Sequence, residues 1–334
     1  MLERKLASIQ EIKDINPIPN ADAIEVATIL GWKVVIKKGE GYHVGDKVVY
    51  CEIDSKLPPR PEYEFLANYN YRVRTQKFRG QVSQGLVLPM SILPEGDYEV
   101  GDDVTAILGV EKYEIPLPMG IAGDIAGPFP GFIQKTDETR IQILGDILPK
   151  YNGIKFYVTE KVDGTSITLF NRNGDIGVCT RNNRMKDTKN NAPWNVLKKL
   201  GAVEKIAELN NIAIQGELIG WNIQGNKYKL KTNEYKFYLF NVFDITNYRP
   251  FPLVEMLNIA KQLGLNTVPI IDEGYILDFD VDALVEMSKG QSIVNPQVRR
   301  EGLVFKSVDY IEDMTLGRLS FKVINPDFLI KYGD

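Results

Sequence analysis

The sequence predicts an α+β protein that consists of a small N-terminal β-barrel and a larger domain of antiparallel sheets flanked by helices. Residues 1–110 contain five or six short apolar runs separated by Gly- and Pro-containing turns, a pattern typical of a small barrel or sandwich. After residue 136, strand-like runs alternate with segments of helical periodicity. The chain has 334 residues, enough for two cores, because single cores stop growing at roughly 250–300 residues.

The expected strands of the first domain are short, and Gly31 is one of the turn residues between them. These strands cover residues 23–30, 32–38, 45–53, 85–89 and 102–108. Residues 111–135 are rich in Pro and Gly and carry little charge, so we expect an irregular linker. Such a linker would let the first domain be removed without cutting the second.

The second domain, residues 136–334, has three segments with apolar residues at helical spacing. They are residues 137–151, residues 195–210, which Gly201 weakens, and residues 252–264, which end at Gly264. The strand-like runs between and after them cover residues 154–161, 165–171, 176–181, 212–219, 236–245, 301–306 and 319–324. We therefore expect a domain built mostly on antiparallel strands.

Composition argues against several kinds of site. Lys and Arg number 40 against 44 Asp and Glu, so any contact with nucleic acid must come from local patches. Cys51 and Cys179 lie in apolar runs without zinc spacing, and a single histidine, His43, argues against histidine-based triads. The first residues lack the apolar part of a secretory signal, and no run of 18 apolar residues occurs. We expect an intracellular protein, cytoplasmic or nuclear, that does not enter a membrane and is monomeric.

Residues 155–170 carry the most chemical information. A strand ends at Lys161, a turn with Asp163 and Gly164 follows, and a second strand begins. A lysine at a strand end before a glycine turn can be held rigidly, and Asp163, two residues on, lies on the same side of an extended chain. Alone, this short pattern is a weak signal, because it arises often by chance and a hairpin turn explains it.

Later segments favour a functional interpretation. In chain order they are a strand ending at Arg181, an apolar strand with the lone acid Glu217, an aromatic strand with Phe240 and Phe243, a strand after Glu301 and a strand with Lys322. An unpaired carboxylate in an apolar strand is costly, so we expect Glu217 to serve a site. Taken in order, these segments resemble the six collinear motifs of the covalent nucleotidyltransferases: ATP-dependent DNA ligases, RNA ligases and mRNA capping enzymes.

The resemblance is greatest to RNA ligases. Lys161 and Arg181 are 20 residues apart and Glu301 and Lys322 are 21 apart, spacings similar to those of phage-type RNA ligases. Residues 134–144, with Arg140, resemble the segment that precedes the nucleophile in RNA ligases. Two N-terminal segments, residues 44–59 and 77–89, resemble the OB-fold module of RNA ligases of the Deinococcus/Naegleria type. Only 12 residues follow Lys322, whereas DNA ligases and capping enzymes place an OB domain there.

The resemblance implies an ATP-dependent RNA ligase that joins 3′-OH and 5′-phosphate ends in a nicked or broken RNA-containing duplex. Lys161 would attack ATP and carry AMP covalently, and the AMP would then cap the 5′ end. Asp163, Glu217 and Glu301 would hold Mg²⁺ or Mn²⁺, which prefers hard oxygen ligands and keeps most of its waters.

The resemblance also implies nucleotide contacts. They involve Arg140, Arg181 and Lys322 at the phosphates, Glu160 at the adenine edge, Glu217 beside the nucleotide, and Phe243 stacked on adenine, with Phe240 as the alternative stacking residue. The family usually has two lysines separated by one residue in its last motif, whereas Lys322 is followed two residues on by Ile324. Either Lys306 supplies the missing charge or that charge is dispensable.

Residues 68–80 interleave aromatic and basic side chains. They contain Tyr69, Tyr71, Arg72, Arg74, Lys77, Phe78 and Arg79. This mixture suits RNA, whose bases stack on aromatic rings while basic side chains contact phosphates; a solvated pair of barrel strands explains it equally well. Two alternative functions remain open: a DNA ligase or capping-type nucleotidyltransferase, and a non-enzymatic RNA-binding protein. Domain order argues against the first, and the intact lysine and acids argue against the second.

Overall fold

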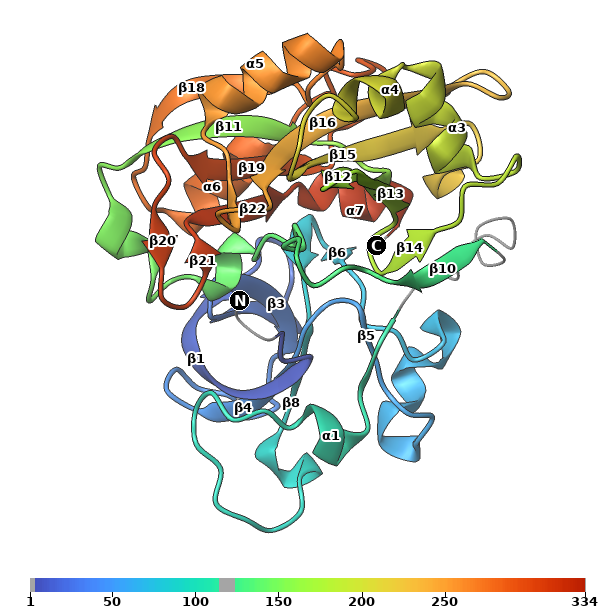
Figure 1. The fold of residues 1–334 in the computed structure, drawn as a ribbon. Helices are drawn as coiled ribbons and strands as arrows, with labels where there is room; N and C mark the ends of the chain where they lie inside the picture. The colour runs from blue at the N-terminus through green and yellow to red at the C-terminus, as the bar shows by residue number, and fades with distance from the viewer. Residues whose placement is uncertain (1–3, 114–123, 334) are drawn as a thin grey trace.

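The computed structural model describes residues 4–113 and 124–333 and has the two predicted parts (Figure 1). The N-terminal part is an OB-fold whose main sheet has the strand order β3-β2-β1-β4-β8, with antiparallel neighbours. Its strands are β1 Ala7–Pro17, β2 Ile24–Ile29, β3 Trp32–Lys37, β4 Lys47–Cys51 and β8 Leu86–Leu88, with the short β5 Ser55–Lys56, β6 Gln76–Phe78 and β7 Gln81–Ser83. A 3₁₀ helix, η1 (Pro61–Tyr69), lies beside them.

Two expectations for this part of the chain are wrong in detail. Residues 105–108, expected in a strand, form the one-turn helix α1 (Thr105–Leu108), which starts where Thr105 N–H donates to Asp103 and stops at Gly109 with φ 67°. The described ends of the expected linker are paired strands: β9 (Glu111–Lys112) joins β5 of the barrel, and β10 (Ile125–Pro128) joins the second domain. Residues 114–123 of that linker lie outside the described residues.

The second domain stacks two antiparallel sheets. The larger sheet has the order β10-β14-β13-β12-β15-β16-β17 and the smaller one β18-β11-β19-β22. Their strands are β11 Lys155–Lys161, β12 Thr165–Arg172, β13 Asp175–Cys179, β14 Asn183–Met185, β15 Ile212–Gly220, β16 Tyr235–Asp244, β17 Arg249–Pro250, β18 Ile270–Ile276, β19 Gly302–Ser307 and β22 Ser320–Ile324. A separate hairpin consists of β20 (Glu312–Asp313) and β21 (Gly317–Arg318).

Helices cover the outer faces of both sheets, as Figure 1 shows for α3, α4 and α5 above the larger sheet. The helices are α3 Ala192–Lys199, α4 Ala202–Ile206, α5 Leu253–Leu263, α6 Val281–Ser288 and α7 Pro326–Tyr332. The expected helix 195–210 is split at Gly201, where φ is 67°, and the third expected helix ends before Gly264 as predicted. Within the described residues, no helix has the length and apolar character needed to cross a membrane.

The expected helix 137–151 is wrong, because its residues form only the 3₁₀ turns η3 (Ile141–Ile143) and η4 (Leu148–Tyr151). Its backbone makes contacts outside the segment. Gln142 C=O accepts from Gly31 N–H of the barrel at 2.7 Å, and Thr139 C=O accepts from Lys322 N–H at 2.8 Å. These hydrogen bonds to other segments replace the backbone hydrogen bonds that a helix would form within itself.

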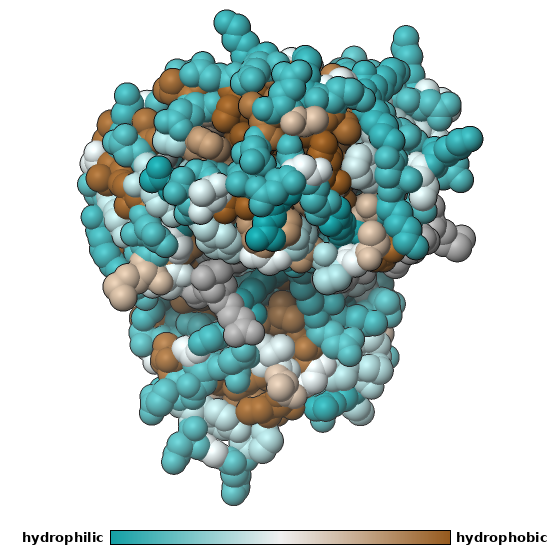
Figure 2. All heavy atoms as spheres, viewed as in Figure 1, coloured by the Kyte–Doolittle hydropathy of each residue, from teal (hydrophilic) through white to brown (hydrophobic). Residues whose placement is uncertain are grey.

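The two domains share apolar packing, which a removable module would lack. Phe328 and Leu329 of α7 belong to the same buried cluster as the barrel strands, and Tyr332 packs against it. Figure 1 shows α7 at the boundary between the domains, and in the view of Figure 2 the surface narrows from the second domain to the barrel. A fragment without the barrel would therefore expose Phe328 and Leu329 to water.

Candidate active site

Lys161 ends β11, an inner strand of the smaller sheet, and lies opposite Gly302 of β19. A Cβ on Gly302 would lie 2.2 Å from Val323 C=O, so no side chain fits beside the lysine. The turn after Lys161 approaches the larger sheet equally closely, since a Cβ on Gly164 would lie 2.4 Å from Leu218 C=O. The two glycines therefore let strands of both sheets close in around the lysine.

Two ion pairs order the lysine and the turn that follows it. Lys161 Nζ donates to both carboxylate oxygens of Glu301 at 2.8 Å, and Lys227 Nζ donates to Asp163 Oδ2 at 2.7 Å. Asp163 N–H also donates to Tyr228 Oη at 3.0 Å. Sequence analysis missed Lys227 and Tyr228, which lie in a polar loop whose pattern carries no signal of a site.

The three predicted acids gather around Lys161 and influence one another. Burial, reinforced by Glu301 and Asp163, raises the pKa of Glu217 to about 8. Burial and Glu301 likewise raise the pKa of Asp163 to about 6, although Lys227 opposes the shift. Burial alone would lower the pKa of Lys161, but Glu301 and Glu217 outweigh it and hold that pKa above its ordinary value. The site thus concentrates acids whose ionisation is opposed by burial and by their mutual repulsion.

This donor set suits a hydrated divalent cation. Among residues 4–113 and 124–333, no three acids, histidines or cysteines lie close enough to ligate one ion directly. Mg²⁺ keeps several of its waters, so carboxylates spaced around it can hold it through those waters. Burial is the main cause of the raised pKa values of Asp163 and Glu217, and repulsion by Glu301 adds to both, so a cation that offsets this repulsion would favour the ionised carboxylates. The residues present therefore fit the cation.

Binding of Mg²⁺ or Mn²⁺ near neutral pH is expected to release protons. The pKa of Glu217, about 8, leaves its carboxyl mostly protonated, and a cation favours the ionised form. Calorimetric titrations in two buffers of different ionisation enthalpy measure this release, which should vanish above about pH 9 because the carboxylate is then already ionised. The variant Glu217→Gln should remove most of the release; an unchanged value would assign the protons to another group.

The predicted phosphate-binding residues divide into two sets. Lys322 lies on the face of the smaller sheet that carries Lys161, and burial together with Arg140 and Lys161 lowers its pKa to about 7. The positive charges of Lys161, Lys322 and Arg140 therefore lie close enough to act on one another, which favours an anionic ligand. Arg181 differs in being exposed: it pairs with Asp137 at 2.8 Å, and Asp137 also acts on the charge of Lys322.

Lys306 is the candidate for the missing second lysine of the last motif. It lies opposite Ser320, two residues before Lys322, and is only 3% exposed. Its Nζ donates to Phe240 C=O at 2.8 Å, and burial with Arg318 lowers its pKa to about 7. A small polar cavity of about 40 Å³ lies beside Lys306, Arg318 and Ser320, so Lys306 can extend the row of cations that starts at Lys161.

The structure does not support Phe243 as the stacking residue. Phe243 is fully buried against Phe170 and is covered by the segment around Ile133, so neither face of its ring is available. Phe240 is half-buried and packs against a cluster that includes Val162, the residue next to Lys161. Of the two candidate stacking residues, Phe240 is therefore the one that keeps an accessible surface near the nucleophile.

Glu160 uses its side chain for structure. Its carboxylate accepts hydrogen bonds from Ser292 Oγ and, at 2.7 Å, from Ile293 N–H, and it is 1% exposed. Burial raises the pKa of this carboxyl, while the two hydrogen bonds oppose the shift. Any contact of Glu160 with an adenine edge therefore has to come from its backbone.

Comparison with known proteins agrees with this geometry. An OB-fold domain family matches residues 6–90, and the RNA ligase family matches residues 154–324. No curated protein sequence matches the chain significantly.

Solved structures of a Naegleria gruberi RNA ligase are similar over almost the full length. The structure with PPi has a TM-score of 0.88 at 41% identity and covers 98% of each chain. A point mutant with ATP and Mn has a TM-score of 0.90 at 41% identity, covering 99% of this chain and 100% of that one. Another point mutant, with AMP and Mn, has a TM-score of 0.88 at 40% identity and covers 98% of both. On the strength of the family match and these identities, the chain belongs to the RNA ligase family.

Proposed function

We propose that Lys161 is the covalent nucleophile of this ATP-dependent RNA ligase. One observation carries the proposal: Lys161 Nζ lies 2.8 Å from both oxygens of Glu301, and Glu217 and Asp163 also act on its charge. Lys161 interacts with three acids that can hold a cation and with Lys322, on which Arg140 also acts, so both cation- and anion-binding groups surround the proposed nucleophile.

In the first step, Lys161 Nζ forms a bond to the α-phosphorus of ATP while the bond to the bridging oxygen breaks and pyrophosphate leaves. The ammonium must lose a proton first, and every acid that pairs with it opposes this loss. A bound divalent cation supplies positive charge that offsets these acids and the phosphates. Lys322 and Arg140 stabilise charge on the phosphates, since phosphoryl transfer depends chiefly on positioning and electrostatics.

In the later steps, the AMP passes from Lys161 to the 5′-phosphate of an RNA strand. The 3′-OH then attacks the capped phosphate, a phosphodiester forms and AMP leaves. Arg181 is exposed and pairs, among the described residues, with the exposed Asp137, so it can exchange that partner for a phosphate at low cost. The proposed substrate is a nicked or broken duplex that contains RNA, sealed by a monomeric enzyme in the cytoplasm or nucleus.

The tip of the β6–β7 hairpin is the proposed RNA contact of the barrel. Lys77, Phe78 and Arg79 are exposed and Arg74 is half-buried. Arg72, expected in the same group, is 9% exposed, pairs with Asp54 at 3.2 Å and stacks on Tyr113. Arg72 therefore belongs to the barrel structure and is left out of the proposed surface.

Changing Arg74, Lys77 and Arg79 together to Ala should weaken duplex binding and reduce its salt dependence. Each lost phosphate contact lowers the slope of log K against log salt by about 0.7–0.9. Fluorescence anisotropy over a salt series measures the slope. The exposed Lys199 and Lys261, on helices α3 and α5 that cover the larger sheet, supply a control double variant. Equal slope changes per removed charge in both variants would contradict a specific surface.

Sealing assays on nicked duplexes of every RNA and DNA strand combination test the function as a whole. We expect ATP-dependent joining where the reacting strands are RNA, with no joining when GTP replaces ATP. Joining of DNA ends at the same rate as RNA ends would remove RNA from the proposed substrate. Joining that continues when GTP replaces ATP would show that the enzyme does not depend on ATP.

A further inference from the structure

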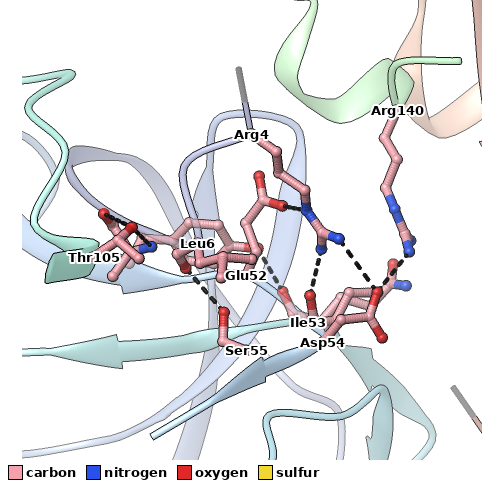
Figure 3. Close-up of polar contacts among 11 residues, drawn as sticks. Arg4, Leu6, Glu52, Ile53, Asp54, Ser55, Thr105 and Arg140 are labelled. Atoms are coloured by element: carbon pink, nitrogen blue, oxygen red, sulfur yellow. Dashed lines mark hydrogen bonds and ion pairs between the residues drawn. The ribbon is translucent and has the colours of Figure 1, made fainter. Parts of the chain in front are cut away.

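Arg140 reaches from the catalytic domain to the barrel. Figure 3 shows its side chain pointing at Asp54, which follows β4, and Nη2 lies 3.4 Å from Asp54 Oδ2. The guanidinium Cζ also lies 5.7 Å from the centroid of the Trp32 ring. One end of this side chain is thus held by two residues of the OB-fold.

The charge of the same Arg140 guanidinium also acts on the active site. Arg140 and Lys322 form a backbone bridge, and the positive charge of Arg140 acts on the Lys322 ammonium. Nη1 of Arg140 is buried and has no hydrogen-bond partner among the described residues. A buried donor without an acceptor is costly, and a phosphate oxygen would satisfy it.

Asp54 is fixed on all sides. Its N–H donates to Val73 C=O at 3.0 Å, and its C=O accepts from Tyr113 N–H at 2.7 Å. Its φ is 70°, a region that non-glycine residues enter only when the surroundings require it. Arg4 and Arg72 approach the same carboxylate at 3.5 and 3.2 Å, so the carboxylate has a firm position from which to orient Arg140.

We propose that Asp54 is a positioning residue of the barrel that aims Arg140 at a phosphate of the bound nucleotide. The guanidinium is a planar fork, so a carboxylate on Nη2 fixes the direction of Nη1. The barrel then contributes to the nucleotide step as well as to RNA binding. This inference rests on the proposed function, because it needs ATP phosphates beside Lys322 and Arg140.

The test compares Asp54→Asn with Glu52→Gln. Asn keeps the size of Asp and tolerates a positive φ, whereas Glu52 belongs to the same cluster but pairs with Arg4, at 2.7 Å, and not with Arg140 (Figure 3). The initial rate of protein–AMP formation is measured in the full-length chain over a range of ATP concentrations. For Asp54→Asn we expect the half-saturating ATP concentration to rise about tenfold, the scale of losing a residue that orients a ligand-binding group. For Glu52→Gln we expect a change below about twofold.

Simple electrostatics predicts the opposite change in the half-saturating ATP concentration. Asp54 is a negative charge near the phosphate site, so its removal alone would strengthen attraction for ATP. A lower half-saturating ATP concentration in Asp54→Asn would therefore overturn the positioning role. Equal changes in Asp54→Asn and Glu52→Gln would also overturn it, because they would reflect only a loosened cluster of arginines.

A double variant tests whether Asp54 acts through Arg140. In the Arg140→Ala background, Asp54→Asn should cause no further loss, whereas independent effects would multiply; multiplied losses would overturn the inference. The wild-type chain separates the two proposals. Wild-type protein that forms no adduct with ATP refutes the proposed function, while normal wild-type labelling with an Asp54→Asn variant identical to wild type refutes the positioning role alone.

Discussion

Lys161→Ala is expected to abolish formation of a protein–AMP adduct with ATP and a divalent cation. The adduct requires a side-chain amine at the end of β11, and the variant leaves none there. Lys161→Arg should fail as well: it retains a cation for Glu301, but a guanidinium does not give up its proton in proteins. Labelling with radioactive ATP, followed by acid denaturation and electrophoresis, measures the adduct.

Lys155 provides the matched control for this experiment. It is an exposed lysine at the start of the same strand, so Lys155→Ala removes an amine without touching the site and should label normally. Labelling of Lys161→Arg at the wild-type level would mean that Lys161 only pairs with Glu301. An acid-stable adduct in Lys161→Ala would place the nucleophile elsewhere.

Alanine in place of Asp163, Glu217 or Glu301 should slow adenylylation or sealing at least about 10²-fold, the scale of losing one preorganised electrostatic group. Each acid acts on the charge of Lys161 and belongs to the set that fits a hydrated cation. Single-turnover rates with saturating ATP and metal measure the loss. Near-wild-type rates in all three variants would refute the metal site, and the exposed Glu204 of α4 gives a control Glu204→Ala that should retain the wild-type rate.

The sequence predicted those parts of the site that local order determines. Lys161, Asp163 and Gly164 are consecutive or nearly so, and a strand followed by a turn fixes their relation. Glu217 was identified because a carboxylate in an apolar strand needs a partner. These inferences depend on short-range geometry, which one sequence contains.

The different surroundings of Phe240 and Phe243 could not be predicted, because the register of β15 and β16 shifts. Gly216 pairs with Leu239 but its neighbour Gln215 pairs with Asn241, so Phe240 is an extra residue in the ladder. Such a bulge breaks the alternation of faces on which a choice between Phe240 and Phe243 depends. Nothing in the local sequence marks its position.

Contacts between segments that are distant in the sequence could not be predicted either. Lys227 is 64 residues from its partner Asp163, and Asp54 is 86 residues from Arg140. The same reason accounts for residues 137–151, whose backbone bonds to Gly31 and Lys322 outweigh a helical pattern of apolar residues. Tertiary partners therefore decided the structure wherever local preference was weak.

The packing of α7 into the barrel has a consequence for how the protein is made. Ribosomes synthesise chains from the N-terminus, and domains generally fold as units in that order. The barrel core includes Ile324, Phe328 and Leu329, which leave the ribosome only after the whole catalytic domain. The apolar face of the nascent barrel therefore stays exposed until those residues emerge. During that interval we expect chaperones that recognise exposed hydrophobic segments to bind it.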